Sequence, residues 1–160
     1  MNNDIITKMI EADCIEHGHF ELANVHTDNL VRQDFIYNFE IADIINTKLY
    51  QAVKDLSFDT IVTYDNTGVI ISYPITLMVK KPMKRNHVKN NFGDVLIIAS
   101  IITSLEDFNS LLITENVKHI ICVTNYSGVK HINGIDVIEL VPVNTWSANE
   151  CPYCKDLENE

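Results

Sequence analysis

Two stretches near the start of the chain repeat apolar residues at helical spacing. In residues 3–16 the apolar positions recur every three or four residues, which predicts an amphipathic helix that Gly18 ends. Residues 35–56 give the clearest helical pattern, because their apolar residues share one broad face. That face consists of Phe35, Ile36, Phe39, Ile44, Ile45, Leu49, Val53 and Leu56. Residues 18–31 between these helices are polar and mixed, and we expect a loop with short strands there.

Four short apolar runs follow, and each predicts a buried strand. They are residues 60–64, 94–100, 119–124 and 135–141. Helical patterns separate the first three runs. One covers residues 69–79 and contains Pro74, and the other covers residues 103–116 and opens with the capping-box pattern Thr-x-x-Glu. The polar residues 80–91 predict a loop, and residues 144–160 predict an irregular, acidic tail.

The alternation of strands and helices predicts the fold class. Strand–helix–strand order with nearly continuous apolar strands indicates an α/β fold with a central, mainly parallel sheet flanked by helices. Sheets of this kind bind ligands at the carboxyl ends of their strands. We therefore expect a site among residues 64–68, 99–107 and 125–128.

The composition excludes several classes of protein. The 160 residues are 46% hydrophobic and 21% charged, and a chain of this length forms one domain that buries roughly 70% of its unfolded surface. The longest apolar run, residues 95–102, is far shorter than the ~20 residues that span a bilayer. The net charge of −10 disfavours nucleic acids and anionic membranes as partners. Four cysteines and the lack of a basic leader indicate a reduced, cytoplasmic protein.

Two motifs resemble those of one family. Residues 18–28 read Gly-His-Phe-Glu-Leu-Ala-Asn-Val-His-Thr-Asp, and residues 151–154 read Cys-Pro-Tyr-Cys. Both resemble orotate phosphoribosyltransferases, which carry Gly-His-Phe and His-Ser-Asp near the N-terminus and often end in Cys-Pro-x-Cys. The resemblance covers nearly the whole chain. It implies a single domain with the type I phosphoribosyltransferase fold: a small hood in residues 1–34, a core in residues 35–143 and the tail.

The resemblance also implies a chemistry. Members of the family transfer ribose 5-phosphate from phosphoribosyl pyrophosphate to a base with Mg²⁺, usually as homodimers. An acidic pair at the end of a strand binds the ribose hydroxyls, and the loop that follows binds the 5′-phosphate. An earlier glycine-rich turn binds the pyrophosphate, and a basic loop closes over it.

The residues at these positions depart from the family pattern. Ala99 and Ser100 replace the acidic pair, and the alanine side chain cannot accept a hydrogen bond. Leu105 and Glu106 replace two glycines of the phosphate loop. Glu106 and Asp107 also place negative charge at a helix N-terminus, where a phosphate would otherwise bind. Phosphate-binding loops need glycines, because glycine tolerates a positive φ and lets backbone N–H groups approach the ligand. The chain has only five glycines, so few positions can form such loops.

Some binding groups remain. Thr103 and Ser104 match the two hydroxyl positions of the phosphate loop, and residues 65–68 keep one glycine of the pyrophosphate turn while adding the carboxylate of Asp65. Five of the twelve basic residues lie at positions 80–89 together with a histidine. The expected ligand-binding residues are Asp65, Asn66, Thr67, Gly68, Ser100, Thr103, Ser104, Lys81, Lys84 and Arg85. If the protein is active, the catalytic candidates are Lys84, Arg85 and His87, and the cofactor is Mg²⁺. The alternative interpretation of the basic residues at positions 80–89 is a solvated, charged hairpin tip that binds no anion.

Histidines and cysteines offer further candidates for metal binding. His17, His19, His26 and Asp28 match no closed zinc motif, and the Cys-x-x-Cys pair at residues 151–154 is half of a zinc site with no second pair. We expect no metal. The histidines are assigned to the hood, and the two cysteines to a structural or unpaired thiol pair.

Three hypotheses about function follow. The leading one is a catalytically degenerate relative of orotate phosphoribosyltransferase, dimeric and repurposed to bind a nucleotide, another phosphorylated small molecule or a protein partner. The second is a divergent but active phosphoribosyltransferase that uses Mg²⁺. The third is a structural or interaction protein whose former pocket is filled by side chains.

Overall fold

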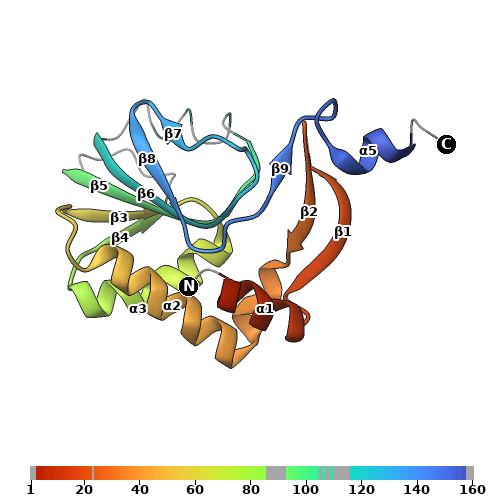
Figure 1. Cartoon of the computed structure of the whole chain (residues 1–160). Coiled ribbons are helices and arrows are strands. Elements are labelled where there is room, and N and C mark those ends of the chain that lie inside the picture. The colour runs from red at the N-terminus through yellow and green to blue at the C-terminus, as the bar shows by residue number, and fades with distance from the viewer. Residues whose placement is uncertain are drawn as a thin grey trace.

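The computed structural model describes residues 3–22, 24–85, 93–104, 106, 109 and 116–157. Within these residues the strands form two sheets. The large sheet has six strands in the order β4-β3-β5-β6-β8-β7, and the small sheet has the order β1-β2-β9. Figure 1 shows helices α2 and α3 beneath the large sheet and the small sheet to its right.

The large sheet is parallel except at one edge. Its parallel strands are β3 (Thr60–Thr63), β4 (Met83–Arg85), β5 (Asp94–Ile102), β6 (Asn116–Asn125) and β8 (Ile135–Glu139). Strand β7 (His131–Ile132) pairs antiparallel with β8. Each of the four predicted strands is present, and the mainly parallel α/β fold is confirmed. The sequence did not predict β4, because it lacks an apolar run: Met83 is half-buried, and the other two residues are basic and exposed. Such residues can still pair at the edge of the sheet, where one side of the strand faces solvent.

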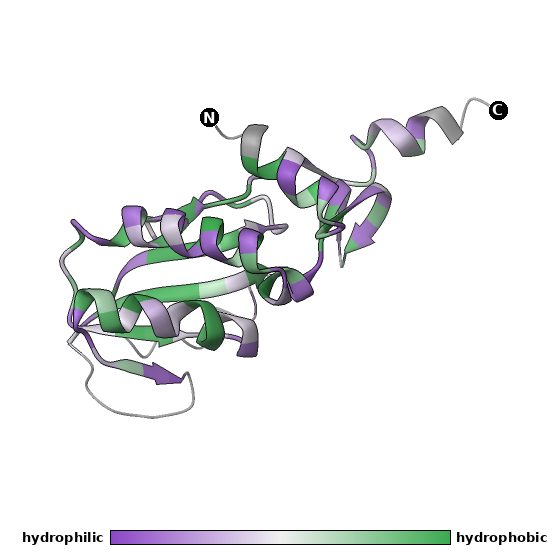
Figure 2. Ribbon diagram, turned by 90° about the horizontal axis from the view of Figure 1, so that it is seen from below, coloured by the Kyte–Doolittle hydropathy of each residue, from purple (hydrophilic) through white to green (hydrophobic). Residues whose placement is uncertain are grey.

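Both faces of the large sheet are buried. Leu96 and Ile98 of β5 pack in one hydrophobic cluster with the helices, whereas Val95, Ile97 and Ala99 pack in a second cluster. This alternation follows from the period of two residues along a strand. Burial on both faces explains why the strands are continuously apolar in sequence. In Figure 2 the central strands are green, whereas β4 is largely purple.

Helices α2 and α3 begin where polar side chains cap them. The pattern predicted over 35–56 divides into a 3-10 helix, η1 (Gln33–Tyr37), and α2 (Phe39–Val53). Asn38 separates them, because its side chain accepts a hydrogen bond from the Ile41 N–H and caps α2. Helix α3 (Asn66–Val79) begins three residues before the predicted 69–79 and contains Pro74.

The N-terminal region differs from the prediction. Helix α1 (Asn3–Glu11) ends well before residue 16, because Asp13 adopts a positive φ of 53° and the chain turns into β1 (Ile15–Leu22). Gly18 therefore lies inside β1 and ends no helix. Strand β1 pairs antiparallel with β2 (Val25–Val31), so the expected loop is a long hairpin.

The tail also contains regular structure, so the expectation of an irregular tail was wrong. Strand β9 (Thr145–Trp146) pairs with β2, and α5 (Pro152–Leu157) follows it. We call the three strands β1, β2 and β9 the hood sheet. Most of the helix predicted over residues 103–116 falls outside the described residues. Among the described helices, none is long and apolar enough to cross a membrane.

Candidate functional site

Asp65 lies where β3 ends and α3 begins. Its backbone is extended, and its carboxylate Oδ1 accepts a hydrogen bond from the Gly68 N–H at 2.6 Å. This contact caps α3, since the first N–H groups of a helix have no partner within the helix. The negative charge also complements the positive end of the helix dipole. The turn predicted at residues 65–68 is therefore the first turn of α3.

The same carboxylate reaches the end of β5. Asp65 Oδ2 accepts from the Ser100 N–H at 2.8 Å, and Asp65 Oδ1 accepts from the Ser100 hydroxyl at 2.7 Å. A Cβ atom on Gly68 would lie 3.2 Å from both Asp65 Oδ2 and the Ile98 carbonyl oxygen, so the helix start packs tightly against β5. We call this set of contacts between Asp65, Gly68 and Ser100 the Asp65 bridge.

Basic and polar side chains lie beside the bridge. Arg85, at the end of β4, donates a 2.6 Å hydrogen bond to Asn66 Oδ1. Thr67 is buried and donates from its hydroxyl to Gln33 Oε1 at 3.3 Å, so it is held by η1. Lys84 and Arg85 are both exposed. The structure therefore brings Arg85 together with the first residues of α3 at the carboxyl edge of the sheet.

Other predicted residues are placed differently. Lys81 precedes β4, and its Nζ lies 5.9 Å from the centre of the Phe58 ring, which precedes β3. Because β3 and β4 are parallel, Lys81 lies at the amino edge of the sheet, away from the Asp65 bridge. Thr103 is exposed and Ser104 half-buried just after β5. His87 lies outside the described residues, as do Lys89, Leu105 and Asp107.

A hollow of about 320 Å³ opens between the end of β6 and the strands that follow. Its walls include Asn125, Lys130, Glu139 and Thr145. Burial raises the pKa of the Glu139 carboxyl above its ordinary value, although the Asn125 amide and Lys130 oppose this shift.

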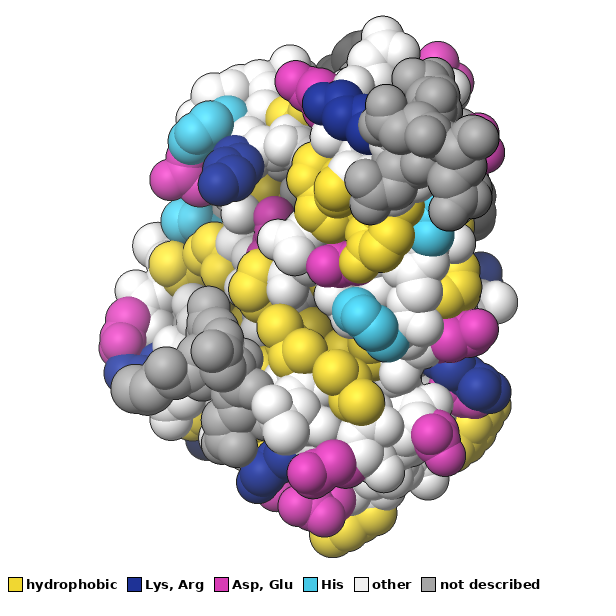
Figure 3. Space-filling model, turned by 45° about the vertical axis from the view of Figure 1, so that its right-hand side comes forward, with side chains coloured by type: hydrophobic (Ala, Val, Ile, Leu, Met, Phe, Trp, Pro, Cys, Tyr) yellow, Lys and Arg dark blue, Asp and Glu magenta, His cyan; other side chains and the backbone are white. Residues whose placement is uncertain are grey.

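On the face shown in Figure 3, hydrophobic side chains gather near the centre, and charged side chains lie mostly toward the margins.

The histidines and cysteines that the sequence analysis treated as separate groups lie together. His19, His26, Cys151 and Cys154 place one potential ligand atom each within 4.8 Å of all the others. His17 instead contacts the Asn29 side chain. The remaining cysteines, Cys14 and Cys122, are buried in the two hydrophobic clusters. Spacing along the chain could not indicate this cluster, because the two pairs are more than 120 residues apart.

Comparison with known proteins identifies the fold. The sequence matches no family model and none of the curated proteins. Among solved structures, UMP synthase of Leishmania donovani superposes with a TM-score of 0.70 at 14% identity, over 87% of this chain and 36% of that chain. Orotate phosphoribosyltransferase of Aeropyrum pernix superposes with a TM-score of 0.68 at 10% identity, over 86% of this chain and 93% of that chain. A protein of Neisseria gonorrhoeae with bound ppGpp superposes with a TM-score of 0.51 at 10% identity, over 76% of this chain and 91% of that chain.

These structures define the class of fold to which the chain belongs, that of the type I phosphoribosyltransferases. The resemblance to orotate phosphoribosyltransferases that the motifs indicated is thereby confirmed at the level of the fold. The chain spans about a third of the UMP synthase but nearly the whole of the Aeropyrum enzyme. At identities of 10–14% the likeness concerns architecture, and activity has to be argued from this chain's own residues.

Proposed function

We propose that this chain is a catalytically degenerate phosphoribosyltransferase-like protein that binds a nucleotide-like or other phosphorylated ligand without transferring a phosphoribosyl group. The observation that carries the proposal is the Asp65 bridge. Its carboxylate accepts hydrogen bonds from the N–H groups of Gly68, in the first turn of α3, and of Ser100, near the carboxyl end of β5. Folds of this kind bind ligands at this edge of the sheet, and a helix N-terminus there offers N–H donors to an anion.

The bridge opposes binding of pyrophosphate at the start of α3. A helix N-terminus attracts one anion, and here the protein's own carboxylate takes that place. Two unit charges 4 Å apart repel by about 4 kcal/mol at an effective dielectric constant of about 20. An incoming phosphate would meet this repulsion and would have to displace three hydrogen bonds of Asp65.

The groups that would hold the ribose and a metal are also missing from this arrangement. Ala99 is fully buried in an apolar cluster, and the hydroxyl of Ser100 is bound to Asp65. Mg²⁺ requires oxygen ligands with free lone pairs, usually carboxylates. Asp65 Oδ1 already accepts two hydrogen bonds and Oδ2 one, which leaves at most one lone pair of this carboxylate for a metal. The described residues of this edge therefore do not offer the set of oxygen ligands of a Mg²⁺ site, and we derive no step through one.

An exposed cation at this edge, Arg85, supports binding of a phosphorylated ligand. Arg85 lies beside Asn66 with its guanidinium group directed across the start of α3, in a chain whose net charge is −10. Guanidinium groups bind phosphate through paired N–H donors. The Neisseria protein with the same architecture was solved with bound ppGpp, which is a phosphorylated nucleotide.

Thermal unfolding with a ligand panel tests the proposal. The panel contains phosphoribosyl pyrophosphate, orotate, orotidine and uridine monophosphates and ppGpp, each with and without Mg²⁺. A ligand at 100 times its Kd stabilises the fold by about 2.7 kcal/mol, which raises Tm by several degrees. We expect a shift with a nucleotide, a smaller shift in Arg85→Ala, and no pyrophosphate release from phosphoribosyl pyrophosphate. Arg32→Ala is the matched control, because Arg32 is an exposed arginine paired with Asp34.

Two outcomes would contradict the proposal. Consumption of phosphoribosyl pyrophosphate with a base would establish an active transferase. Absence of a shift with every ligand would favour an interaction protein whose pocket the Asp65 bridge has closed.

We further propose that the protein forms a homodimer through the outer face of α3. This helix buries Ile71 and Ile75 against the core, yet four large apolar residues on its other side are 52–63% exposed. They are Ile70, Tyr73, Leu77 and Met78. A helix that is apolar all round is ordinarily covered on every side, and a second copy of the chain supplies that cover.

Light scattering with size-exclusion chromatography tests the dimer. We expect a dimer for the parent protein and a monomer for Leu77→Glu, because the charge would be buried in the interface. Phe39→Glu, at an exposed apolar position at the start of α2, is the control and should stay dimeric. A monomeric parent, or a dimer that survives Leu77→Glu, would contradict this arrangement.

A further inference from the structure

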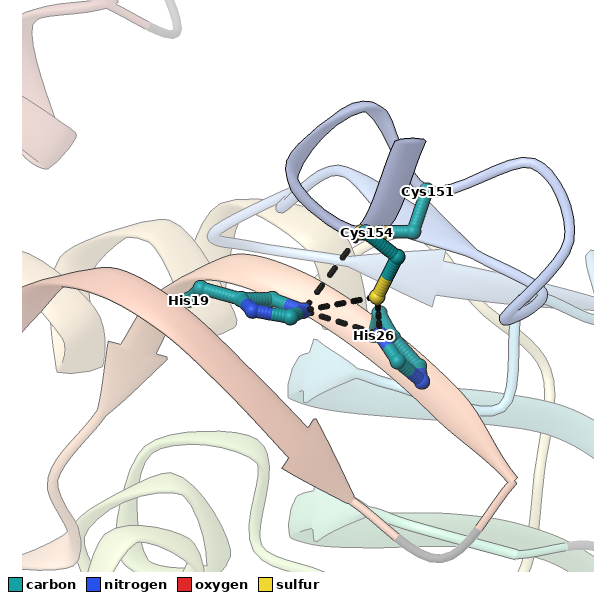
Figure 4. Close-up of side chains that lie close together, drawn as sticks. All are labelled: His19, His26, Cys151 and Cys154. Atoms are coloured by element: carbon teal, nitrogen blue, oxygen red, sulfur yellow. Dashed lines mark hydrogen bonds between the residues drawn. The ribbon is translucent and has the colours of Figure 1, made fainter. Parts of the chain in front are cut away.

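Four side chains from distant segments converge where the tail meets the hood sheet. His19 comes from β1 and His26 from β2, whereas Cys151 and Cys154 come from the turn before α5 and from α5 itself (Figure 4). Cys151 is fully buried, and His26 is 6% exposed. Cys154 is half-buried and His19 is exposed, so the cluster has a buried side and a side that solvent reaches. None of its residues takes part in the Asp65 bridge.

The distances between these atoms resemble the edges of a tetrahedron around a metal ion. His19 Nε2 lies 3.5 Å from Cys151 Sγ and 3.6 Å from Cys154 Sγ, and His26 Nδ1 lies 3.3 Å from Cys154 Sγ. Tetrahedral Zn²⁺, with Zn–S of ~2.3 Å and Zn–N of ~2.0–2.1 Å, separates sulfur and nitrogen ligands by ~3.5 Å. The two histidine nitrogens lie 2.9 Å apart, somewhat closer than the ~3.3 Å of that geometry.

Hydrogen bonds alone do not account for the arrangement. His19 Nε2 is within 3.6 Å of His26 Nδ1 and of both cysteine sulfurs. One ring nitrogen acts either as a single donor or as a single acceptor, so it cannot satisfy three such partners at once. A cation between the four atoms can, because each then directs a lone pair inward.

The ligand set selects the kind of metal. Two thiolates and two neutral imidazoles are a soft, mixed set that favours Zn²⁺ in tetrahedral geometry, and the two thiolate charges balance the charge of the ion. The Cys-x-x-Cys spacing is the one that zinc sites use for adjacent ligands. Because the protein supplies all four ligands, no position stays open for substrate, which is typical of structural sites.

We propose that His19, His26, Cys151 and Cys154 bind one Zn²⁺ per chain and that this ion fastens the C-terminal segment to the hood sheet. Among the described residues, β9 pairs with β2 through two residues, Asn144 bonds to Asp28, and α5 has six residues, so the regular structure that joins this segment to the hood sheet is short. Stacking of Tyr153 on the His19 ring, with centroids 5.4 Å apart and planes at 15°, holds one ligand in its orientation.

Metal analysis of the purified protein tests the proposal. After incubation with Zn²⁺ and desalting, we expect about one equivalent of zinc per chain, falling about tenfold or more in His26→Ala and in Cys154→Ser. His17→Ala and Cys14→Ala are the matched controls, since both residues lie outside the cluster, and they should keep their zinc. Zinc well below one equivalent in the parent protein, or undiminished zinc in Cys154→Ser, would overturn the proposal.

Co²⁺ provides a measurement that does not depend on the folding of variants. In the parent protein, Co²⁺ should give the intense d–d bands of tetrahedral coordination and a thiolate charge-transfer band, and Zn²⁺ should displace it. Weak octahedral bands would overturn the assignment. A disulfide between Cys151 and Cys154 in freshly purified, unreduced protein, detected by mass, would overturn it as well.

Discussion

At the scale of single residues, Asp65 combines a local role with a long-range one. It caps α3 through Gly68, as many aspartates do, and it also binds both polar groups of Ser100, which is 35 residues away. A capping residue that made only the local contact would leave the Ser100 N–H for a ligand. The bridge therefore stabilises the fold at the position where the fold would otherwise bind an anion.

Removing the Asp65 side chain should cost more stability than removing an ordinary cap. Asp65→Ala deprives Gly68 and Ser100 of their partner, and we expect a loss of about 2–4 kcal/mol, from a cap of ~1 kcal/mol and buried donors at ~1–3 kcal/mol. Asn38→Ala, which removes the cap of α2 and its bond to the Ile41 N–H, should lose only about 1 kcal/mol. Urea denaturation measures both. Equal losses would mean that the contacts with Ser100 contribute no net stability.

Glu139 should make stability depend on pH. Burial raises its pKa in the folded state, so the folded protein binds a proton more readily than the unfolded chain does. Stability therefore falls as pH rises from the ordinary glutamate pKa of about 4.3 through the raised value. Glu139→Gln removes this loss and can keep the hydrogen bond from the Asn125 amide. We expect the variant to melt at a higher temperature than the parent at pH 7 and at the same temperature near pH 3.5. A variant that melts below the parent at pH 7 would show that Glu139 does not lower the stability there.

At the scale of elements, α3 is constrained by a proline in its interior. Pro74 has no N–H to donate to the preceding turn, and its ring crowds the carbonyl of that turn. The helix persists because Ile71 and Ile75 on either side are buried in the core. Tertiary packing thus outweighs a local preference against helix.

Replacing this proline should stabilise the protein. We expect Pro74→Ala to add about 1–2 kcal/mol, less than the full ~3 kcal/mol cost of an interior proline because the unfolded chain also gains freedom. Pro82→Ala, outside the helices, is the control and should bring no gain. Urea denaturation measures both variants. A loss in Pro74→Ala would indicate that the proline stabilises the native position of the helix.

At the scale of the whole molecule, Tyr126 joins the large sheet to the hood sheet. It follows β6 and is 1% exposed, its hydroxyl accepts from the Val31 N–H at 2.6 Å, and it donates to the Asn29 carbonyl oxygen at 3.2 Å. Burial raises the pKa of this phenol, so it stays protonated and able to donate. The hood sheet is thus fixed to the large sheet in part by a contact between residues 95 positions apart.

Tyr126→Phe should loosen that junction. The Val31 N–H loses its partner within the protein, so we expect a loss of about 1–3 kcal/mol in the free energy of unfolding. Amide exchange should rise in β2 more than in β5, because the hydroxyl bonds to Val31 and Asn29, which both lie in β2. Tyr73→Phe, at an exposed position on α3, should change neither quantity. Uniform loss of protection across both strands would show that Tyr126 serves the core as a whole.

The sequence by itself determined the parallel α/β core. Apolar runs and helical periodicity are local patterns, and they located β3, β5, β6 and β8 and most of α2 and α3. Local rules were less successful at the ends of the chain. The hairpin of β1 and β2 and the short β9 depend on pairing with other segments. The predicted loop with short strands is therefore one long hairpin, and part of the predicted irregular tail is a strand.

The same division applies to the candidate sites. The motif comparison placed Asp65 in the turn where the family binds pyrophosphate and Ser100 at a position where the family binds the ribose hydroxyls, because those positions are read in order along the chain. Only the tertiary structure decided that these two residues bind each other and that His19 and His26 meet the two cysteines of the tail. Contacts across 35 to 135 residues leave no periodic trace in sequence, since they arise only when separately formed elements pack together.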